Sequence, residues 1–200
     1  LEKIHVMVED ATEGLAGVSA SQVEIQSGIQ FYDGITTAEI QEILIKSASD
    51  LIDLDHPNYQ FVAARLLLFS IRKSLYGRSR ELPKLEDHIV KCVTQDVYDG
   101  DIYSKYSKED IEKANGYIDH NRDFLFTYAG LRQVADKYLV QDRSTGQVYE
   151  TPQFMYMMIA LTIFAEYPKE KRLNYVRRYY NAISKHKLNI PTPIMAGVRT

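Results

Sequence analysis

The sequence predicts a mainly α-helical protein, and three observations lead to that prediction. Apolar residues recur at spacings of three and four along most of the 200 residues, as they do on the buried face of a helix. Serine, threonine or proline stands before several of these segments, which is the pattern of helix N-termini. The period-two alternation that indicates strands is confined to residues 137–150.

Four helices are expected in residues 1–77, which we predict to form one compact domain. The first covers residues 2–14, and the second begins at a Ser-x-x-Glu capping box in residues 21–24. Thr36-Thr37-Ala38-Glu39 is a second capping box, and the apolar stripe behind it reaches about residue 53. Pro57 suits the start of the fourth helix, and Gly77 suits its end.

A polar segment ending in proline, residues 78–84, is predicted to be a linker. Residues 85–200 are then expected to form a second, helical domain that contains one β-hairpin. The hairpin is predicted where residues 137–141 and 147–150 flank Ser144-Thr145-Gly146. Thr151-Pro152 supplies an N-cap and a first-turn proline for an apolar helix that extends to Phe164.

Composition excludes several classes of function. A net charge of −3 gives no overall attraction to nucleic acid or to an anionic membrane, and no apolar segment has membrane-spanning length. Cys92 is the one cysteine, so the chain has no internal disulfide and no multi-thiolate metal site. We expect a cytoplasmic protein that binds no metal. The start at Leu1, without an initiator methionine, and the end at Thr200 lead us to expect part of a longer protein.

No self-contained catalytic constellation is found, but two residues suggest anion binding. Thr37 stands at a helix start and Lys73 near the end of the next helix, and Lys3 is a third polar group at the start of the bundle. A helix N-terminus with a threonine and two lysines converging on it can hold a triphosphate. The alternative is structural: Thr37 begins a helix, and Lys73 favours a helix C-terminus through the dipole.

The amino-acid sequence closely resembles that of the N-terminal portion of the large (alpha) subunit of class I, Ia-type, ribonucleoside-diphosphate reductase. The resemblance covers essentially the whole length. It is carried by residues 1–5, Gln30-Phe31-Tyr32-Asp33-Gly34-Ile35, residues 45–48, 59–65, 131–150 and 191–200.

The resemblance implies an ATP-cone in residues 1–77, without the β-strands that precede its helices in the family. Residues 85–200 would lead into the family's ten-stranded α/β barrel, where a thiyl radical reduces ribonucleoside diphosphates to deoxyribonucleotides for DNA synthesis. The effector would be ATP or dATP. The implied partners are a small (beta) subunit with a di-iron/radical cofactor, further copies of the large subunit, and thioredoxin or glutaredoxin.

The resemblance also assigns residues. Lys3, Thr37 and Lys73 match effector-contacting positions of the cone, Ile4 and Ile40 match apolar positions near the base, and Thr192 matches a substrate-contacting threonine. No catalytic residue is expected in this chain, because Cys92 matches none of the family's reactive cysteines. Gln41 and Ser70 stand where cellular enzymes of the family have histidines, which favours a phage-type enzyme that dATP does not inhibit.

Two alternatives remain open at this stage. One is a nucleotide-binding ATP-cone regulator without catalysis of its own, although regulators of that type carry a zinc ribbon of several cysteines. The other is a helical interaction fragment whose cone no longer binds nucleotide.

Overall fold

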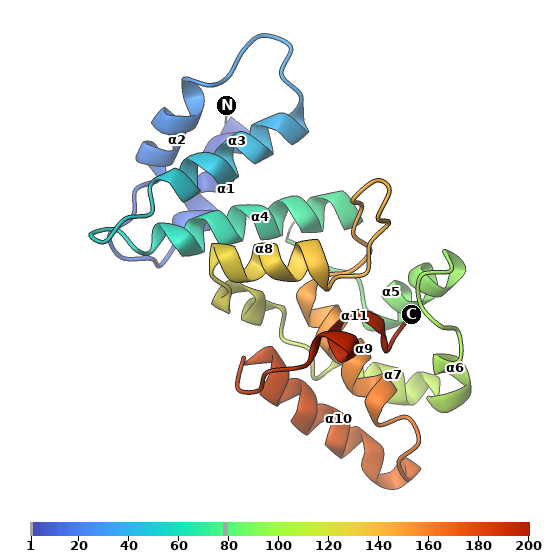
Figure 1. Ribbon diagram of the computed structural model, residues 1–200. Helices are drawn as coiled ribbons and strands as arrows, with labels where there is room; N and C mark the ends of the chain where they lie inside the picture. The colour runs from blue at the N-terminus through green and yellow to red at the C-terminus, as the bar shows by residue number, and fades with distance from the viewer. Residues whose placement is uncertain (1, 78–79) are drawn as a thin grey trace.

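The computed structural model describes residues 2–77 and 80–200, and in this part of the chain the regular secondary structure is helical (Figure 1). The helices, eleven α-helices and one 3-10 helix in these residues, are α1 (Glu2–Thr12), α2 (Ala20–Gly28), α3 (Thr37–Asp50), α4 (Tyr59–Tyr76), α5 (Leu85–Thr94), α6 (Ile102–Lys105), α7 (Lys108–Asn115), η1 (His120–Leu125), α8 (Tyr128–Lys137), α9 (Pro152–Ile163), α10 (Lys169–Ser184) and α11 (Thr192–Gly197). None of the helices within these residues has the length and apolarity needed to cross a membrane.

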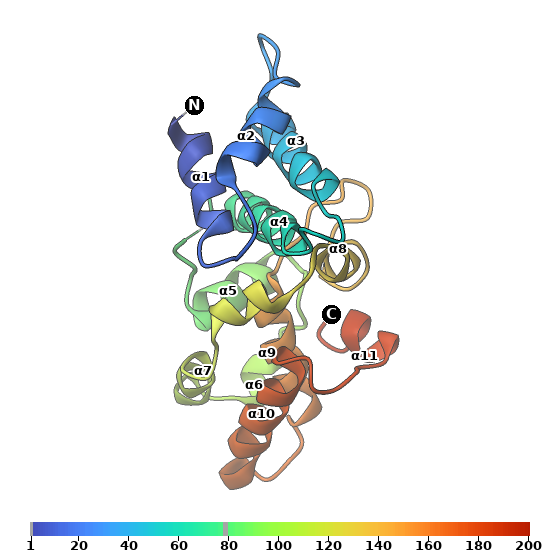
Figure 2. The same ribbon diagram turned by 90° about the vertical axis from the view of Figure 1, so that its left-hand side faces the viewer.

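The first four helices form a bundle in which α3 and α4 run antiparallel and pack along their lengths (Figures 1 and 2). The capping box predicted at the start of α3 is formed: Glu39 N–H donates to Thr36 Oγ1 at 3.2 Å, and Thr36 N–H donates to Glu39 Oε2 at 2.9 Å. Gly77 ends α4 in the left-handed region with φ of 73°, where glycine carries no steric penalty.

The start of α2 differs from the prediction by two residues. Ser19, not Ser21, is the N-cap, and its hydroxyl accepts a hydrogen bond from Gln22 N–H at 3.4 Å. Glu24, expected to complete a capping box, instead accepts a hydrogen bond from the His5 ring at 2.7 Å. The capping-box pattern in residues 21–24 therefore lies inside the helix, because a second serine two residues earlier caps it.

α4 is the central helix of the molecule, and its apolar side chains are buried on more than one face. α3 and α1 cover it on one side, while α8 and η1 cover it on the other (Figure 2). The Arg72 guanidinium on α4 donates to the Asp123 carboxylate of η1 at 2.9 Å, and both side chains are almost fully buried. Gln153 of α9 donates to the same carboxylate at 2.9 Å. The last helix of the bundle is thus fixed directly to the second half of the chain.

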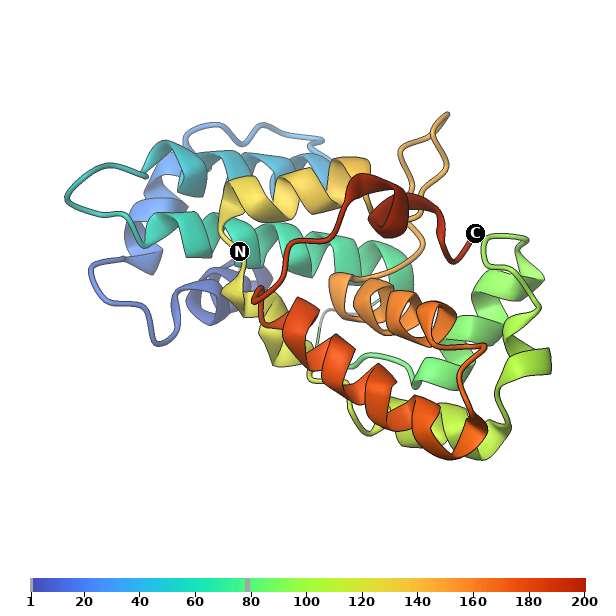
Figure 3. The same cartoon turned by 60° about the horizontal axis from the view of Figure 1, so that its bottom comes forward.

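The second half of the chain is built around α9, which is apolar on all sides and buried from Pro152 to Leu161. α10 lies alongside α9 (Figure 3). Most of its basic residues are exposed, whereas Arg172 is buried and pairs with Asp110 of α7. The predicted helix start at Thr151-Pro152 is observed, with Thr151 as N-cap and Pro152 in the first turn.

The predicted β-hairpin in residues 137–150 is present only as a looped segment with one isolated antiparallel bridge, between Gln141 and Val148. Backbone hydrogen bonds join Asp142 N–H to Gln147 O and Tyr149 N–H to Val140 O, each at 2.9 Å. The ladder stops there because Val140 N–H donates to the Glu150 carboxylate at 2.8 Å, which is a side-chain acceptor. Two strands therefore do not form in this described segment.

The predicted linker, residues 78–84, is described only in part, because Arg78 and Ser79 lie outside the described residues. Arg80 forms an ion pair with Asp10 of α1, with Nε 3.2 Å from Oδ2. Leu82 and Pro83 are half-buried. The described end of the segment thus runs along the protein and contacts the first helix.

Candidate functional site

The start of α3 leaves one hydroxyl group unused. Thr36 supplies the N-cap, and its hydroxyl is engaged with Glu39. Thr37 is the first helical residue and is exposed, and no hydrogen-bond partner for its hydroxyl is found in residues 2–77 and 80–200. A helix N-terminus carries a partial positive charge and free N–H groups, so a hydroxyl there can help to bind an anion.

The end of α4 lies beside this start. Ser70 Oγ on α4 donates to Gln41 Oε1 on α3 at 3.1 Å, which fixes the register of the antiparallel pair. Thr37 is one turn before Gln41 on α3, and Lys73 is one turn after Ser70 on α4, so both positions extend beyond this contact toward the same end of the pair. The Lys73 side chain is exposed there.

The other predicted effector contacts occupy neighbouring elements. Lys3 is exposed in the first turn of α1, and Ile4 and Ile40 are partly buried and pack against the hydrophobic core. No hydrogen bond or ion pair joins Lys3, Thr37 and Lys73 to one another within the described residues. Lys73 and the N-terminus of α3 give this end of the α3–α4 pair the chemistry to bind a phosphate, whereas no hydrogen bond or ion pair joins Lys3 to either of them in the described residues.

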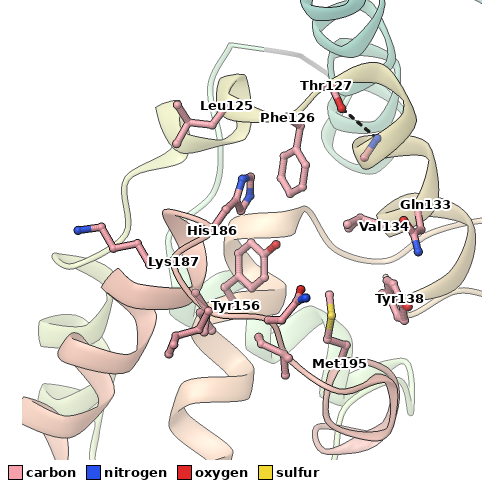
Figure 4. A pocket seen from close by; sticks show the side chains of 15 residues that line it. Leu125, Phe126, Thr127, Gln133, Val134, Tyr138, Tyr156, His186, Lys187 and Met195 are labelled. Atoms are coloured by element: carbon pink, nitrogen blue, oxygen red, sulfur yellow. Dashed lines mark hydrogen bonds between the residues drawn. The ribbon is translucent and has the colours of Figure 1, made fainter.

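Thr192, the predicted substrate contact, is the first residue of α11 and is exposed. Its Oγ1 lies 3.4 Å from the Tyr138 hydroxyl oxygen at the end of α8. Tyr138 and Met195 line a hollow of about 620 Å³ enclosed by α8, α9 and the segment that joins α10 to α11 (Figure 4). His186 and Gln133 extend into the same region (Figure 4).

A buried ion pair near Thr192 was not anticipated by the sequence analysis. Arg199 Nε lies 3.0 Å from both carboxylate oxygens of Glu150, and the two side chains are 0% exposed. Burial opposes the charge on Arg199, but the attraction and hydrogen bond of Glu150 outweigh it and raise the pKa of the guanidinium. Both residues lie in segments that carry the resemblance to the family, residues 131–150 and 191–200. No local sequence pattern, however, pairs residues that are 49 positions apart.

Two buried side chains that could suggest a reactive site, Cys92 and His88, are held in their neutral forms. Burial raises the pKa of the Cys92 thiol to about 12 and lowers the pKa of His88 to about 3. The His88 ring stacks on Phe154 with centroids 4.2 Å apart. In the described ranges, no three or more histidine, cysteine, aspartate or glutamate side chains gather as metal ligands.

Comparisons with known proteins identify the two halves of the chain. The family model described as "ATP cone domain" matches residues 1–74, and the one described as "Ribonucleotide reductase, all-alpha domain" matches residues 124–200. The whole chain is similar to ribonucleoside-diphosphate reductase 1 subunit alpha of Escherichia coli K12, at 50% identity. It is similar over the same extent to the ribonucleoside-diphosphate reductase subunit alpha of Enterobacteria phage T4, at 46% identity.

The chain spans 26% of the length of each of these two relatives. Its two matched regions follow one another along the chain, and α4 and α8, one from each region, pack together. The chain belongs to the family of ribonucleoside-diphosphate reductase alpha subunits, of which it carries the ATP cone and the all-alpha domain.

Proposed function

We propose that this chain is the regulatory and substrate-edge part of an alpha subunit that reduces ribonucleoside diphosphates to 2′-deoxyribonucleoside diphosphates. The observation that carries the proposal is the similarity to reductase alpha subunits over all 200 residues, at up to 50% identity. The match of residues 124–200 to the reductase all-alpha domain argues against a free-standing ATP-cone regulator.

The two halves of the chain have different proposed roles. Residues 1–77 form the ATP cone, residues 78–84 the linker, and residues 85–200 the helical region that leads into the catalytic barrel of the complete subunit. Cys92 takes no part in the chemistry, because a buried thiol with a pKa of about 12 remains protonated. The radical and redox cysteines come from the remainder of the subunit.

ATP or dATP is the proposed effector, bound where α3 begins and α4 ends. Thr37 and Lys73 contact the phosphates from the two helices, Lys3 contacts them from α1, and Ile4 and Ile40 support the base. The exposed positions of Lys3, Thr37 and Lys73 and the unpartnered hydroxyl of Thr37 support this assignment.

The proposed regulation acts through quaternary structure. The effector can shift the equilibrium between two assemblies only if its affinity for them differs. The partners are the small subunit, which carries the di-iron/radical cofactor, further copies of the large subunit, and thioredoxin or glutaredoxin as reductant. The proposed location is the cytoplasm, where such reductants act.

The direct test is an activity assay on the complete alpha subunit. With its small subunit and a dithiol reductant, it should convert cytidine diphosphate to the deoxyribonucleotide, and ATP should increase the rate. A complete subunit that is folded and binds its small subunit, yet does not reduce any of the four ribonucleoside diphosphates, would rule out the proposal.

A further inference from the structure

The short helix that carries Thr192, α11, is stabilised by a side chain that lies outside the helix, that of Arg199. α11 has six residues, and a helix of that length is unstable by itself in water. Its N-cap is Pro191, which provides no side-chain hydrogen bond. The Arg199 guanidinium donates from Nη1 to the Met195 carbonyl at 2.6 Å, so a cation satisfies a backbone acceptor in the last turn.

Arg199 is itself anchored by two segments, the residue before α9 and the α5–α6 connection. Glu150, just before α9, receives its Nε hydrogen bonds at 3.0 Å. The Tyr98 hydroxyl donates to Oε2 of the same carboxylate, and burial and the Glu150 charge raise the pKa of Tyr98 well above its ordinary value, which keeps it a donor. Asp99 N–H donates to the Arg199 carbonyl at 3.2 Å. The chain after α11 therefore runs against the α5–α6 connection (Figure 3).

The same guanidinium also holds the residue that touches Thr192. Arg199 Nη2 donates to the backbone carbonyl of Tyr138 at 2.8 Å. The Tyr138 side chain then places its hydroxyl 3.4 Å from Thr192 Oγ1. Val140 N–H, two residues further on, donates to Glu150 at 2.8 Å. The backbone of this segment is thus fixed at two points to one buried ion pair.

From this arrangement we infer that Tyr138 is a positioning residue for the substrate: its hydroxyl orients the Thr192 hydroxyl toward a ribonucleoside diphosphate, and the Glu150–Arg199 pair holds Tyr138 and α11 at the required separation. The inference rests on the proposed function, since Thr192 has a substrate to contact only in that setting.

The Tyr138 hydroxyl acts on the orientation of the Thr192 hydroxyl. An exposed threonine hydroxyl rotates among staggered positions, and a hydrogen bond from one side selects the position that leaves its remaining hydrogen or lone pair facing outward. Hydrogen bonds that act in a substrate complex are often longer without the substrate, so 3.4 Å is compatible with this role. Losing the contact lowers the fraction of molecules that are ready to bind.

The test is a double-mutant cycle in the complete alpha subunit assayed with its small subunit. Tyr138→Phe removes only the hydroxyl, and Thr192→Val removes only the partner hydroxyl at similar volume. We expect Tyr138→Phe to raise KM for cytidine diphosphate about 3- to 10-fold with kcat little changed. Because Tyr138 acts through Thr192, the double variant should have the KM of Thr192→Val alone.

Two controls separate positioning from folding. Tyr128→Phe removes a tyrosine hydroxyl at the opposite end of α8 and should leave KM unchanged. The thermal midpoint and the ATP response of Tyr138→Phe should equal those of the unmodified protein.

The remaining outcomes distinguish the two levels of the proposal. A normal KM in Tyr138→Phe, or separate effects that multiply in the double variant, overturns the positioning role while Thr192→Val still raises KM. A normal KM in Thr192→Val refutes the substrate contact itself, and the role of Tyr138 with it. An unmodified complete subunit without reductase activity contradicts the proposed function.

Discussion

Ser70 on α4 donates a hydrogen bond to Gln41 on α3 at 3.1 Å, one helical turn from Lys73 on α4 and from Thr37 on α3. The resemblance of the sequence to class I reductases implies that cellular enzymes of the family carry histidines at these two positions. In this chain Gln41 and Ser70 are neutral and hydrogen-bond to each other, so neither side chain can offer a positive charge to a nucleotide.

We therefore predict that dATP does not inhibit the complete enzyme. Over a range of dATP concentrations, cytidine diphosphate reduction should stay at or above the rate without effector, whereas ATP should raise it. Gln41→His combined with Ser70→His is the matched variant in which inhibition should increase. Strong inhibition of the unmodified enzyme by dATP at concentrations where ATP stimulates would contradict the prediction.

The buried Arg72–Asp123 pair connects the cone to the all-alpha domain, so breaking it should destabilise the whole molecule. Arg72→Met leaves the Asp123 carboxylate buried with Gln153 as its remaining partner. We expect the free energy of unfolding, measured with urea, to fall by about 3–5 kcal/mol.

Two comparisons sharpen that measurement. Arg72→Met with Asp123→Leu should recover much of the loss, because the pair is then replaced by apolar groups. Arg80→Met, which breaks an exposed ion pair with Asp10, should cost less than about 1 kcal/mol. Equal losses for Arg72→Met and Arg80→Met would show that the buried pair does not connect the domains.

Stability should fall as the pH drops from 6.5 toward 5, because two buried histidines remain neutral in the folded protein. Burial lowers the pKa of His88 to about 3 and that of His120 to about 4. The unfolded chain takes up protons near pH 6.5 and the folded chain does not, so acid favours unfolding. Each histidine should contribute a slope of roughly 1.4 kcal/mol per pH unit below its unfolded pKa.

The measurement is urea unfolding at several pH values between 5 and 8. Carboxylates with lowered pKa values, such as Asp110, act below this window, and His5, whose pKa is raised by Glu24, acts in the opposite direction. His5→Gln should therefore remove a small gain in stability just above pH 6.5, where the folded chain holds that proton more tightly than the unfolded chain, whereas His88→Gln should reduce the slope below pH 6.5. A stability that is constant over this range would be inconsistent with neutral buried histidines.

Local chemistry made much of the fold predictable. The capping box at Thr36 and the proline start of α9 each depend on residues within one helical turn, so a short pattern contains all the relevant groups. The start of α2 was misplaced because Ser19 and Ser21 both fit the local code, and only the fold selects between them. Alternation around Ser144 predicted two strands, but Glu150 takes a backbone donor that a ladder would need.

Parts of the candidate site were also predictable from local sequence, and other parts were not. The helix start at Thr37 and the helix end near Lys73 were visible in the sequence. The Gln41–Ser70 contact, the Arg72–Asp123 pair and the Glu150–Arg199 pair join residues 29 to 51 positions apart. Such pairs depend on tertiary packing, and nothing in the local spacing of charges singles them out.

Adenine nucleotide is proposed to bind where α3 begins and α4 ends, and calorimetric titration of the complete alpha subunit with ATP measures that binding. We predict that Thr37→Ala combined with Lys73→Ala weakens ATP binding at the cone at least about 10-fold, since charge-assisted contacts to phosphate are lost. Lys46→Ala, which removes another exposed lysine on α3, should leave the affinity unchanged. An unchanged ATP affinity in the Thr37/Lys73 double variant would show that the nucleotide does not bind at this site.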